Sequence, residues 1–516
     1  MVKERQLMKK AISVFLATAI FCASCTDVDP GRGTEGDVEL AAGGLGASCA
    51  DGEPGSQTSM GGAFAGLTPK YGSNGKFLEP VGKPAEGSTP IATRAELEAV
   101  RGNLGGKYCL ACDIDLGGAE WVPIGDGSSN AAESRFTGTF DGQGHVIRNL
   151  TVTGEGHGHD GLFGAVHGAN VKNVGFEGTS LSISPSAYYN YAAAVCGGAY
   201  AASVIRNCYN EGGVSVYSYS KEEHASTRAG GVCGDLGGSS LIVGCYNAGD
   251  VSAGAASSYA GAGGVCGYAS KSALIGSCFN TGKVSAPFNA NAGGIAGATS
   301  HSSHISNCSN FGEVCAADSV GGISGFVASG SSISSCWNAG EVCASASEGY
   351  AKAGGIVGCS ASAVSDCFNT GSVSARSSSE RSACAGGISG DGRFFESPIS
   401  NCYNAGAVSS VSDAGPSYIG GISGRYYDFS YVHGDGHGFD TAASNYCLDL
   451  YGSGYGVQLA PAQMLDAASF NGFDFIKVWG MSPSLNGGRP FLRKVALPCG
   501  AAADPFKIDP LQRSGS

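Results

Sequence analysis

Seven cysteines divide the middle of the chain into units of 28 to 37 residues, and each unit repeats the same residues at the same places. Ile or Val stands three positions before each cysteine, Asn two positions after it, Gly four after and Val six after. The seven are Cys208, Cys245, Cys278, Cys308, Cys336, Cys367 and Cys402. A repeat this regular predicts one structural unit per repeat, stacked on its neighbours, and no other feature constrains the fold as strongly.

A second block of the form Gly-Gly-Ile/Val-x-Gly precedes most units, from Gly230–Gly234 to Gly420–Gly424. Gly161-Leu162-Phe163-Gly164 is its first form, and Ala193–Gly197 is a degenerate copy. The last Gly of the block lies 11 residues before the cysteine in five of seven units, whereas the distance from the cysteine to the next block varies from 17 to 26. We therefore expect packed structure on one side of each unit and surface loops, such as Tyr217-Ser218-Tyr219-Ser220, on the other.

Short runs between Gly and Asn corners do not suit helical repeats, which need long stripes of period 3.6 and little Gly. The pattern predicts an all-β fold, a parallel β-solenoid (β-helix) of about 8–9 coils, each with about three short strands. Neighbouring coils would lie about 4.8 Å apart, the spacing of paired strands. We expect Gly to serve positive-φ or tight corners, and Asn to tolerate left-handed backbone and to bond along the stack.

Composition agrees with this fold and excludes others. Of 516 residues 86 are Gly, only 14% are charged, and the net charge is −13. The Gly has no three-residue period, which excludes collagen, and the acidic charge argues against a nucleic-acid partner. A hydrophobic share of 42% is too high for a disordered chain. Scarce charge fits a stack in which like charges would lie one above another.

The first 25 residues predict an export signal, because Lys3, Arg5, Lys9 and Lys10 precede an apolar run. The sequence Cys22-Ala23-Ser24-Cys25 resembles the lipobox of bacterial lipoproteins, in which the final cysteine becomes the lipid anchor, here Cys25. An ordinary secretory signal is the alternative. Either way, the predicted localisation is outside the cytoplasm, in the cell envelope, with the lipid-anchored form displayed at the cell surface.

Five segments are expected. Residues 1–25 would be the signal and 26–88 a flexible tether rich in Gly, Ser, Pro and acidic residues. Residues 89–155 would form an N-terminal cap and the first strands, 156–445 the repeat solenoid, and 446–516 a C-terminal cap and tail.

Both ends of the solenoid should be closed by capping structure. Thr93-Arg94-Ala95-Glu96 is a capping box for a short helix. Pro461 to Ala468 predicts a second short helix, and the aromatic residues Phe473, Phe475, Trp479 and Phe491 would supply a lid.

Several ordered motifs support a family resemblance. Gly161-Leu162-Phe163-Gly164 matches the name motif of the GLUG-motif repeat proteins of bacteria. The lead-in is similar too, with Cys112–Leu116, Trp121–Gly125, Phe136–His145 and Ile147–Leu150 in order. The sequence therefore resembles this family.

The resemblance covers roughly residues 90–495 and implies an extracellular, surface-attached β-solenoid. Some members of the family are surface proteins or adhesins, and others carry the repeats beside an immunoglobulin-cleaving metallopeptidase domain. This chain contains no His-Glu-x-x-His, so it lacks the zinc pair of that peptidase.

The cysteines admit two interpretations. An exported chain favours disulfides, yet the seven repeat cysteines fall where an interior ladder would run, and in-register strands hold Cβ atoms near 4.8 Å, beyond the usual span of a bridge. We expect buried thiols, and the same for the pairs Cys233 with Cys266 and Cys315 with Cys343. Cys109 and Cys112 have redox or zinc spacing, but in a strand positions i and i+3 face opposite ways.

No metal site or cofactor is predicted from the remaining residues. The His-rich segments Gly156–Asp160 and His433–His437 suit surface turns better than metal sites. Acidic residues after the Gly corner, such as Glu313, Glu341 and Asp250, alternate with Lys283 and with small residues, so no acid–base pair stands out.

The residue after each repeat cysteine is aromatic in six of seven units. If Cys and Asn face inward, these rings point outward and would form an exposed ladder on which sugar rings or peptide side chains could pack. The alternative is a stabilising stack of rings covered by loops. The candidate ligand-binding residues are Tyr209, Tyr246, Phe279, Trp337, Phe368 and Tyr403.

The function predicted from these features is that of a surface-displayed lipoprotein, an elongated, non-enzymatic repeat scaffold for adhesion or for binding an extracellular glycan or a host or matrix protein. The expected contact with the membrane is through the N-terminal lipid. Two alternatives remain open, a polysaccharide-acting β-helix enzyme and a purely structural spacer. Clustered carboxylates in a groove would favour the enzyme, and a surface of Ser, Ala and Tyr would favour adhesion.

Overall fold

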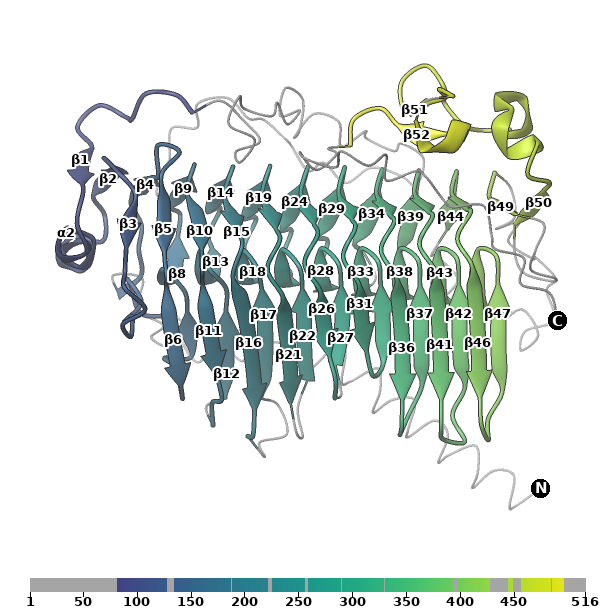
Figure 1. The fold of residues 1–516 in the computed structure, drawn as a ribbon, viewed down its shortest axis with the longest axis horizontal. Helices are drawn as coiled ribbons and strands as arrows, with labels where there is room; N and C mark the ends of the chain where they lie inside the picture. Colours follow the sequence, from purple (N-terminus) through teal and green to yellow (C-terminus); the bar gives the residue numbers. More distant parts are fainter. Residues whose placement is uncertain are drawn as a thin grey trace, which may run out of the picture. The chain divides into compact units, whose positions relative to one another are not determined.

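The computed structural model describes residues 81–495, apart from 128–133, 187, 221–224, 256–258, 289, 329, 393–397, 427–443, 449–455 and 484. Nearly all regular structure in this part of the chain is β-strand, and the strands of the coils pair in parallel with their equivalents in the neighbouring coils (Figure 1). Three of the sheets contain nine strands each. The predicted parallel β-solenoid of about 8–9 coils is therefore confirmed. The predicted signal with Cys25 lies outside the described residues, as does the tether up to residue 80.

Each coil contains five short strands, not the three expected. In one coil these are β14 (Val204–Arg206), β15 (Tyr209–Asn210), β16 (Gly213–Ser218), β17 (Ser226–Gly230) and β18 (Cys233–Leu236). Stacking turns them into five sheets, which we number 1 to 5 in this order. The count differs because the turn before each repeat cysteine and the Gly-Gly corner each divide a run that looks continuous in sequence.

The sheets differ in how far they extend along the stack, because sheets 1 and 2 also include strands of the two ends. Their first and last strands are β1 (Thr89–Ile91) and β44 (Ile399–Ser400) in sheet 1, β3 (Ile114–Asp115) and β50 (Val457–Leu459) in sheet 2, β6 (Thr151–Gly154) and β46 (Val408–Ser412) in sheet 3, β7 (His159–Asp160) and β47 (Ser417–Gly420) in sheet 4, and β8 (Phe163–His167) and β48 (Ser423–Tyr426) in sheet 5.

The interior is built from the repeated residues. Ile205, Cys208 and Val214 of one coil are buried and belong to one continuous apolar core with their equivalents in the other coils. The strand register sets identical residues of neighbouring coils beside each other, as with Ile205 and Ile242 or Val214 and Val251. The conserved spacing within the repeat is therefore the condition for filling this core without gaps.

The repeat asparagines form a ladder inside the stack. Asn210 Nδ2 donates to Asn247 Oδ1 of the next coil at 2.9 Å and to the Gly212 carbonyl of its own turn at 2.7 Å. The same pair of bonds recurs at Asn247, Asn280, Asn310, Asn338 and Asn369. These side chains are fully buried, so the ladder satisfies amides that would otherwise be costly inside a core. The expectation of stacked Asn amides is confirmed.

The left-handed backbone near each repeat cysteine is adopted not by the repeat asparagine, as expected, but by the residue before the cysteine. The residue before each repeat cysteine has a φ between 51° and 60°, in the series Asn207, Gly244, Ser277, Asn307, Ser335, Asp366 and Asn401. The ladder asparagines do not, so their predicted role in left-handed backbone is wrong. Gly264 shows a different reason for Gly in the repeat, since a Cβ there would lie 2.2 Å from the Gly294 carbonyl oxygen and 2.4 Å from Asn280 Cγ.

The N-terminal end carries the expected capping box. Helix α2 (Arg94–Ala99) starts after Thr93, whose Oγ1 accepts from the Glu96 amide while Glu96 Oε2 accepts from the Thr93 amide. A 3₁₀ helix, Val100–Gly102, follows. Among the described residues no helix is long and apolar enough to cross a membrane.

The predicted helix at the C-terminal end is replaced by two short 3₁₀ helices, Gln463–Leu465 and Ala467–Ser469. A third, Asn486–Gly488, precedes β52 (Phe491–Leu492), which pairs antiparallel with β51 (Trp479–Gly480). We call residues 457–495 the C-terminal cap.

The asparagine ladder predicts a large effect of a single amide. Asn310→Ala would remove one hydrogen-bond partner each from Asn280 Nδ2, Asn338 Oδ1 and the Gly312 carbonyl, at about 1–3 kcal/mol for a buried group left unsatisfied. We expect a marked fall in the midpoint of guanidinium unfolding followed by circular dichroism. Asn170→Ala, at an exposed position of β9 (Asn170–Lys172), is the control and should change stability by no more than about 0.5 kcal/mol. Equal midpoints for the two variants would refute the role of the ladder.

Candidate functional site

The aromatic ladder forms, but it is not exposed. Ring centroids of neighbouring coils lie 4.8–5.1 Å apart and nearly parallel, as for Tyr246 with Phe279 and Phe368 with Tyr403. The rings point away from the main core, as expected. All six candidates are at most 8% exposed, so the predicted exposure of Tyr209, Tyr246, Phe279, Trp337, Phe368 and Tyr403 is wrong.

The C-terminal cap explains the burial of the last three rings. Trp337, Phe368 and Tyr403 share an apolar cluster with cap residues that include Phe470 and Trp479. Tyr403 also donates to the Pro490 carbonyl at 2.6 Å. The cap thus folds back along the outer side of sheet 2, and the predicted aromatic lid contacts the ladder itself. We expect truncation of these rings to lower stability.

The first rings of the ladder have polar partners at their edge. The Tyr209 hydroxyl donates to Glu177 and the Tyr246 hydroxyl to Glu211, both at 3.3 Å. Burial, together with these carboxylates, raises the pKa of both hydroxyls above the usual range. They therefore remain protonated donors that hold the rings in the stack.

The seven repeat cysteines are buried free thiols, as expected. The thiol of Cys208 donates to the Arg206 carbonyl at 3.3 Å, and that of Cys245 to the Val243 carbonyl at 3.4 Å. Burial raises the pKa of these two thiols well above the usual value, which keeps them unreactive. Cys233 and Cys266 are buried thiols as well.

Cys315 and Cys343 are the exception, because they form a disulfide across neighbouring coils. Their Cα atoms are 4.7 Å apart, which is within the range that a bridge allows. The prediction of a thiol stack was wrong here because these two side chains lie on the outer side of sheet 3, where the sulfur atoms can turn toward each other.

The other metal hypotheses find no support among the described residues. Cys109 is buried and Cys112 is exposed, so the pair does not face one way. His157 Nδ1 lies 2.9 Å from Asp160 Oδ1 and is held in an ion pair. His433 and His437 lie outside the described residues. Glu313, Cys315 and Cys343 form the one group in the described part of the chain with three donor atoms within 4.8 Å of one another.

The outer side of sheet 3 is a surface on which polar side chains are exposed or partly exposed. Inward Val and Ala alternate there with outward residues that stack in register from coil to coil. One outward row is Ser182, Ser215, Ser252, Ser285, Cys315, Cys343, Ser374 and Ser409. Its strands include β11 (Ser180–Ile183), β21 (Val251–Ala255), β26 (Val284–Ala286), β31 (Val314–Ala316), β36 (Val342–Ala346) and β41 (Val373–Ser377).

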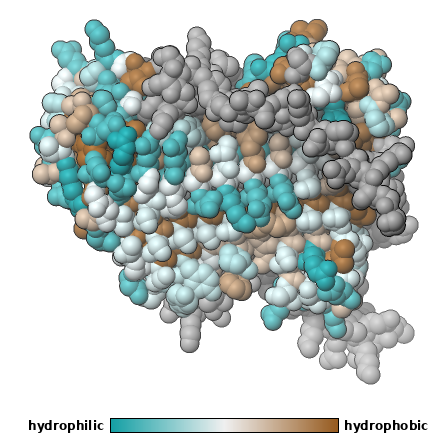
Figure 2. Space-filling view, in the orientation of Figure 1, coloured by the Kyte–Doolittle hydropathy of each residue, from teal (hydrophilic) through white to brown (hydrophobic). Residues whose placement is uncertain are grey.

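The serine end of this row lines a shallow depression. Its volume is about 440 Å³, and it runs across four coils from Thr179 to Ser285, with Asp250 and Lys283 at one side. The charged residues at the corner continue the stack, since Lys283 Nζ lies 2.9 Å from Glu313 Oε1. Figure 2 shows small, pale residues over much of the visible face, crossed by a band of hydrophilic ones.

Aromatic side chains gather where sheets 3 and 4 are connected, at the opposite end of the sheet 3 strands from Asp250 and Lys283. Tyr217 follows Ser215 on the outer side of β16, and its ring centroid is 4.7 Å from Tyr219 and 6.1 Å from Phe288. Tyr219 is 63% exposed and Phe288 54%. We call this group the aromatic edge; its members are the exposed Tyr188, Tyr189, Tyr219, Tyr259 and Phe288 and the partly exposed Tyr217.

A glycine lets the Tyr217 ring lie along this surface. Gly254 is the partner of Tyr217 in the next coil, and a Cβ on Gly254 would come within 2.8 Å of the Tyr217 ring. The ring therefore lies across β21 toward Phe288. This gives the edge a fixed aromatic platform beside the serine row.

The serine row and the aromatic edge offer hydrogen-bonding groups and flat apolar faces on one surface. Among the described residues, the one group with three donor atoms within 4.8 Å of one another contains a single carboxylate, that of Glu313. The Tyr-rich insertions are visible in the sequence, but the place where they meet is not. The signal was the alternation Ser215-Val216-Tyr217, which puts serine and tyrosine on one face.

No family model matches the chain. Halomucin of Haloquadratum walsbyi (strain DSM 16790 / HBSQ001) is 30% identical over 130 residues, which is 22% of this chain and 1% of halomucin. The chain thus matches a very small part of that relative.

Two solved structures are similar to part of this chain. One is a Bacteroides ovatus protein assigned as an immunoglobulin A1 protease, with a TM-score of 0.41 and 22% identity over 59% of this chain and 90% of that chain. The other is an IgA1 protease with a TM-score of 0.36 and 16% identity, covering 56% of this chain and 23% of that chain.

The contact between ladder and cap can be tested at one hydroxyl. Tyr403→Phe removes the donor to the Pro490 carbonyl and an acceptor for Asn486 Nδ2, at a cost of about 1–3 kcal/mol. Amide hydrogen exchange in residues 463–492 should become roughly tenfold faster or more. Tyr209→Phe, whose hydroxyl bonds to Glu177, should leave exchange in the cap unchanged. Equal exchange in both variants would contradict this contact.

Proposed function

We propose that this chain is an exported, lipid-anchored surface protein of the GLUG-repeat type, and that it acts by binding extracellular ligands without catalysis. The ligand class we favour is glycan, and the binding surface is the outer side of sheet 3 with the aromatic edge. The single observation that carries the proposal is the exposed aromatic edge beside an open row of serine hydroxyls.

The chemistry of this surface suits a sugar chain. Aromatic faces pack against the apolar face of a sugar ring, and hydroxyl and carboxylate groups bond to its hydroxyls. The serine hydroxyls recur at the coil spacing, and aromatic residues occur at the connections between sheets 3 and 4 of four successive coils. An extended ligand can therefore contact several coils at once. A deep pocket is not required, because shallow contacts add along a repeated surface.

The binding proposal predicts a clear effect of three rings. Tyr217→Ala, Tyr219→Ala and Phe288→Ala together should weaken binding on a glycan array by roughly tenfold or more, since each aromatic contact contributes about 0.5–1.5 kcal/mol. The thermal unfolding midpoint should change little, because Tyr219 and Phe288 are largely exposed.

Ile476→Ala is the matched control, since Ile476 is 87% exposed but lies in the C-terminal cap. It should bind like the unchanged protein. If the triple variant also binds like the unchanged protein, the aromatic edge is not the site. If matrix proteins are bound and glycans are not, the ligand is a protein.

The anchor is tested separately. Cys25→Ser should move the protein from the membrane fraction to the soluble fraction and abolish incorporation of radiolabelled palmitate, because the lipid is attached through the thiol of that residue. Cys22→Ser is the control and should remain in the membrane fraction with its label. Retention of Cys25→Ser in the labelled membrane fraction would refute the proposed anchor.

A further inference from the structure

Two consecutive coils contain the same five residues, Gly-Glu-Val-Cys-Ala, at Gly312–Ala316 and Gly340–Ala344. In a strand, Glu and Cys two positions apart lie on the same face. Pairing of β31 with β36 sets Cys315 beside Cys343. The carboxylate of Glu313 and two sulfur atoms are thereby brought to one place on the outer side of sheet 3.

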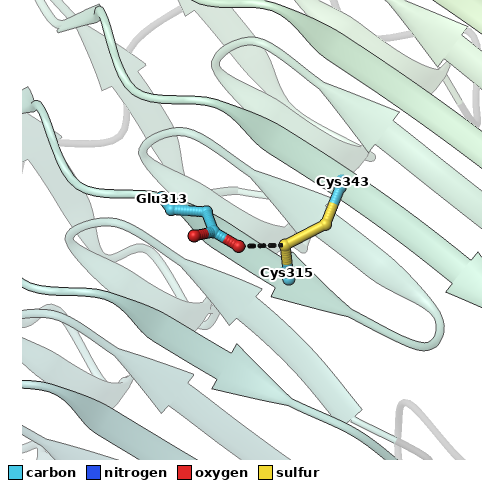
Figure 3. A group of neighbouring side chains, drawn as sticks. All are labelled: Glu313, Cys315 and Cys343. Atoms are coloured by element: carbon cyan, nitrogen blue, oxygen red, sulfur yellow. Dashed lines mark hydrogen bonds between the residues drawn. A yellow bond between two sulfur atoms is a disulfide. The ribbon is translucent and has the colours of Figure 1, made fainter.

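The geometry of this place is compact. Glu313 Oε1 lies 3.2 Å from Cys315 Sγ, and Cys315 is bonded to Cys343 (Figure 3). The three donor atoms all lie within 4.8 Å of one another, and the three residues are partly exposed. A small ion can therefore reach them from solvent.

The fold does not require cysteine here. Six other coils have serine at the same outward position and stack in the same register, namely Ser182, Ser215, Ser252, Ser285, Ser374 and Ser409. The coils joined by the disulfide are already paired through backbone hydrogen bonds, such as the Val314 amide to the Glu341 carbonyl at 2.8 Å. Two adjacent cysteines with a carboxylate beside them thus point to chemistry beyond stacking.

We propose that Cys315, Cys343 and Glu313 form a thiol-gated site for Zn²⁺. Two thiolates and one carboxylate are a ligand set that zinc accepts in tetrahedral geometry, which leaves a fourth position for water. Glu341 precedes Cys343 by two residues, as Glu313 precedes Cys315, and is the candidate to replace water at that fourth position. As a disulfide the two sulfurs carry no charge and the site is closed.

The site opens when a dithiol reduces the Cys315–Cys343 disulfide. The dithiol transfers two electrons and two protons, the Cys315–Cys343 bond breaks to two thiols, and the reductant becomes a cyclic disulfide. Zinc then displaces the two thiol protons, so binding is stronger at higher pH.

The charged side chains around this site include some that favour zinc binding and one that opposes it. Asp250, Glu313 and Glu341 stack at the corner with one cation, Lys283, so the strip attracts a divalent cation. Lys283 Nζ forms an ion pair with Glu313 Oε1 at 2.9 Å, and this ion pair must break when zinc binds. The Lys283 side chain is half exposed, so it can move into solvent.

The test uses the purified full chain reduced with dithiothreitol, desalted under nitrogen and titrated with Co²⁺ and then Zn²⁺. We expect one equivalent of Co²⁺ to give sulfur-to-cobalt charge-transfer absorption, and Zn²⁺ to displace it. We expect no such signal from the oxidised chain. Zinc should also protect Cys315 and Cys343, among the cysteines of the reduced chain, from alkylation detected by mass spectrometry.

Variants separate this site from the other thiols. Cys315→Ser with Cys343→Ser restores the residue of the other coils, so it should fold and lose one equivalent of metal. Glu313→Gln should weaken zinc binding by about tenfold or more, and Lys283→Gln should strengthen it. Cys112→Ser, which removes an exposed free thiol, is the control and should bind like the unchanged protein.

The proposal is overturned if the reduced double-serine variant binds as much metal as the unchanged protein, or if zinc leaves the alkylation of Cys315 and Cys343 unchanged. It would also be overturned by a Glu313→Gln variant with unaltered affinity. None of these measurements depends on glycan binding, so they can fail or succeed independently of the proposed function.

Discussion

In-register stacking of the coils is the constraint on which the rest of this structure depends. Parallel pairing sets each residue directly beside its equivalent, about 4.8 Å away, so every inward position must accept a copy of itself. Ile, Val and Cys do so by packing, and Asn does so through hydrogen bonds between side-chain amides, which run from Asn210 to Asn404. A buried charge repeated at that spacing could not be paired, which explains why the chain has few charged residues.

The same constraint leaves the outer side of the coils free to vary. In sheet 3 the inward positions remain Val and Ala, while the outward row changes from serine to cysteine and back without a change of register. Binding groups can therefore be added to single coils at little cost to folding. The aromatic edge and the Cys315–Cys343 pair both use this freedom, one in the connections between strands and one on the strands themselves.

Particular residues show how far sequence reasoning reached. The repeat spacing was enough to predict the parallel solenoid and the Asn ladder, because each depends on identical neighbours in the next coil. The local sequence was enough to predict the Thr93–Glu96 capping box, because its partners are three residues apart. The aromatic ladder was predicted to stack, and it does. Its burial could not be predicted, because Trp479 and Phe470 reach it from a segment with no repeat pattern.

The sequence by itself determined that the coils stack in parallel, which repeat residues face inward, and an approximate number of coils, since periodicity and register carry that information. Only the tertiary structure decided which outward residues reach solvent. The C-terminal cap packs over Trp337, Phe368 and Tyr403. Cys315 and Cys343, on the outward side of β31 and β36, form a disulfide. Exposure depends on what packs against a face from elsewhere in the chain, and a repeat describes only the contacts between its own copies.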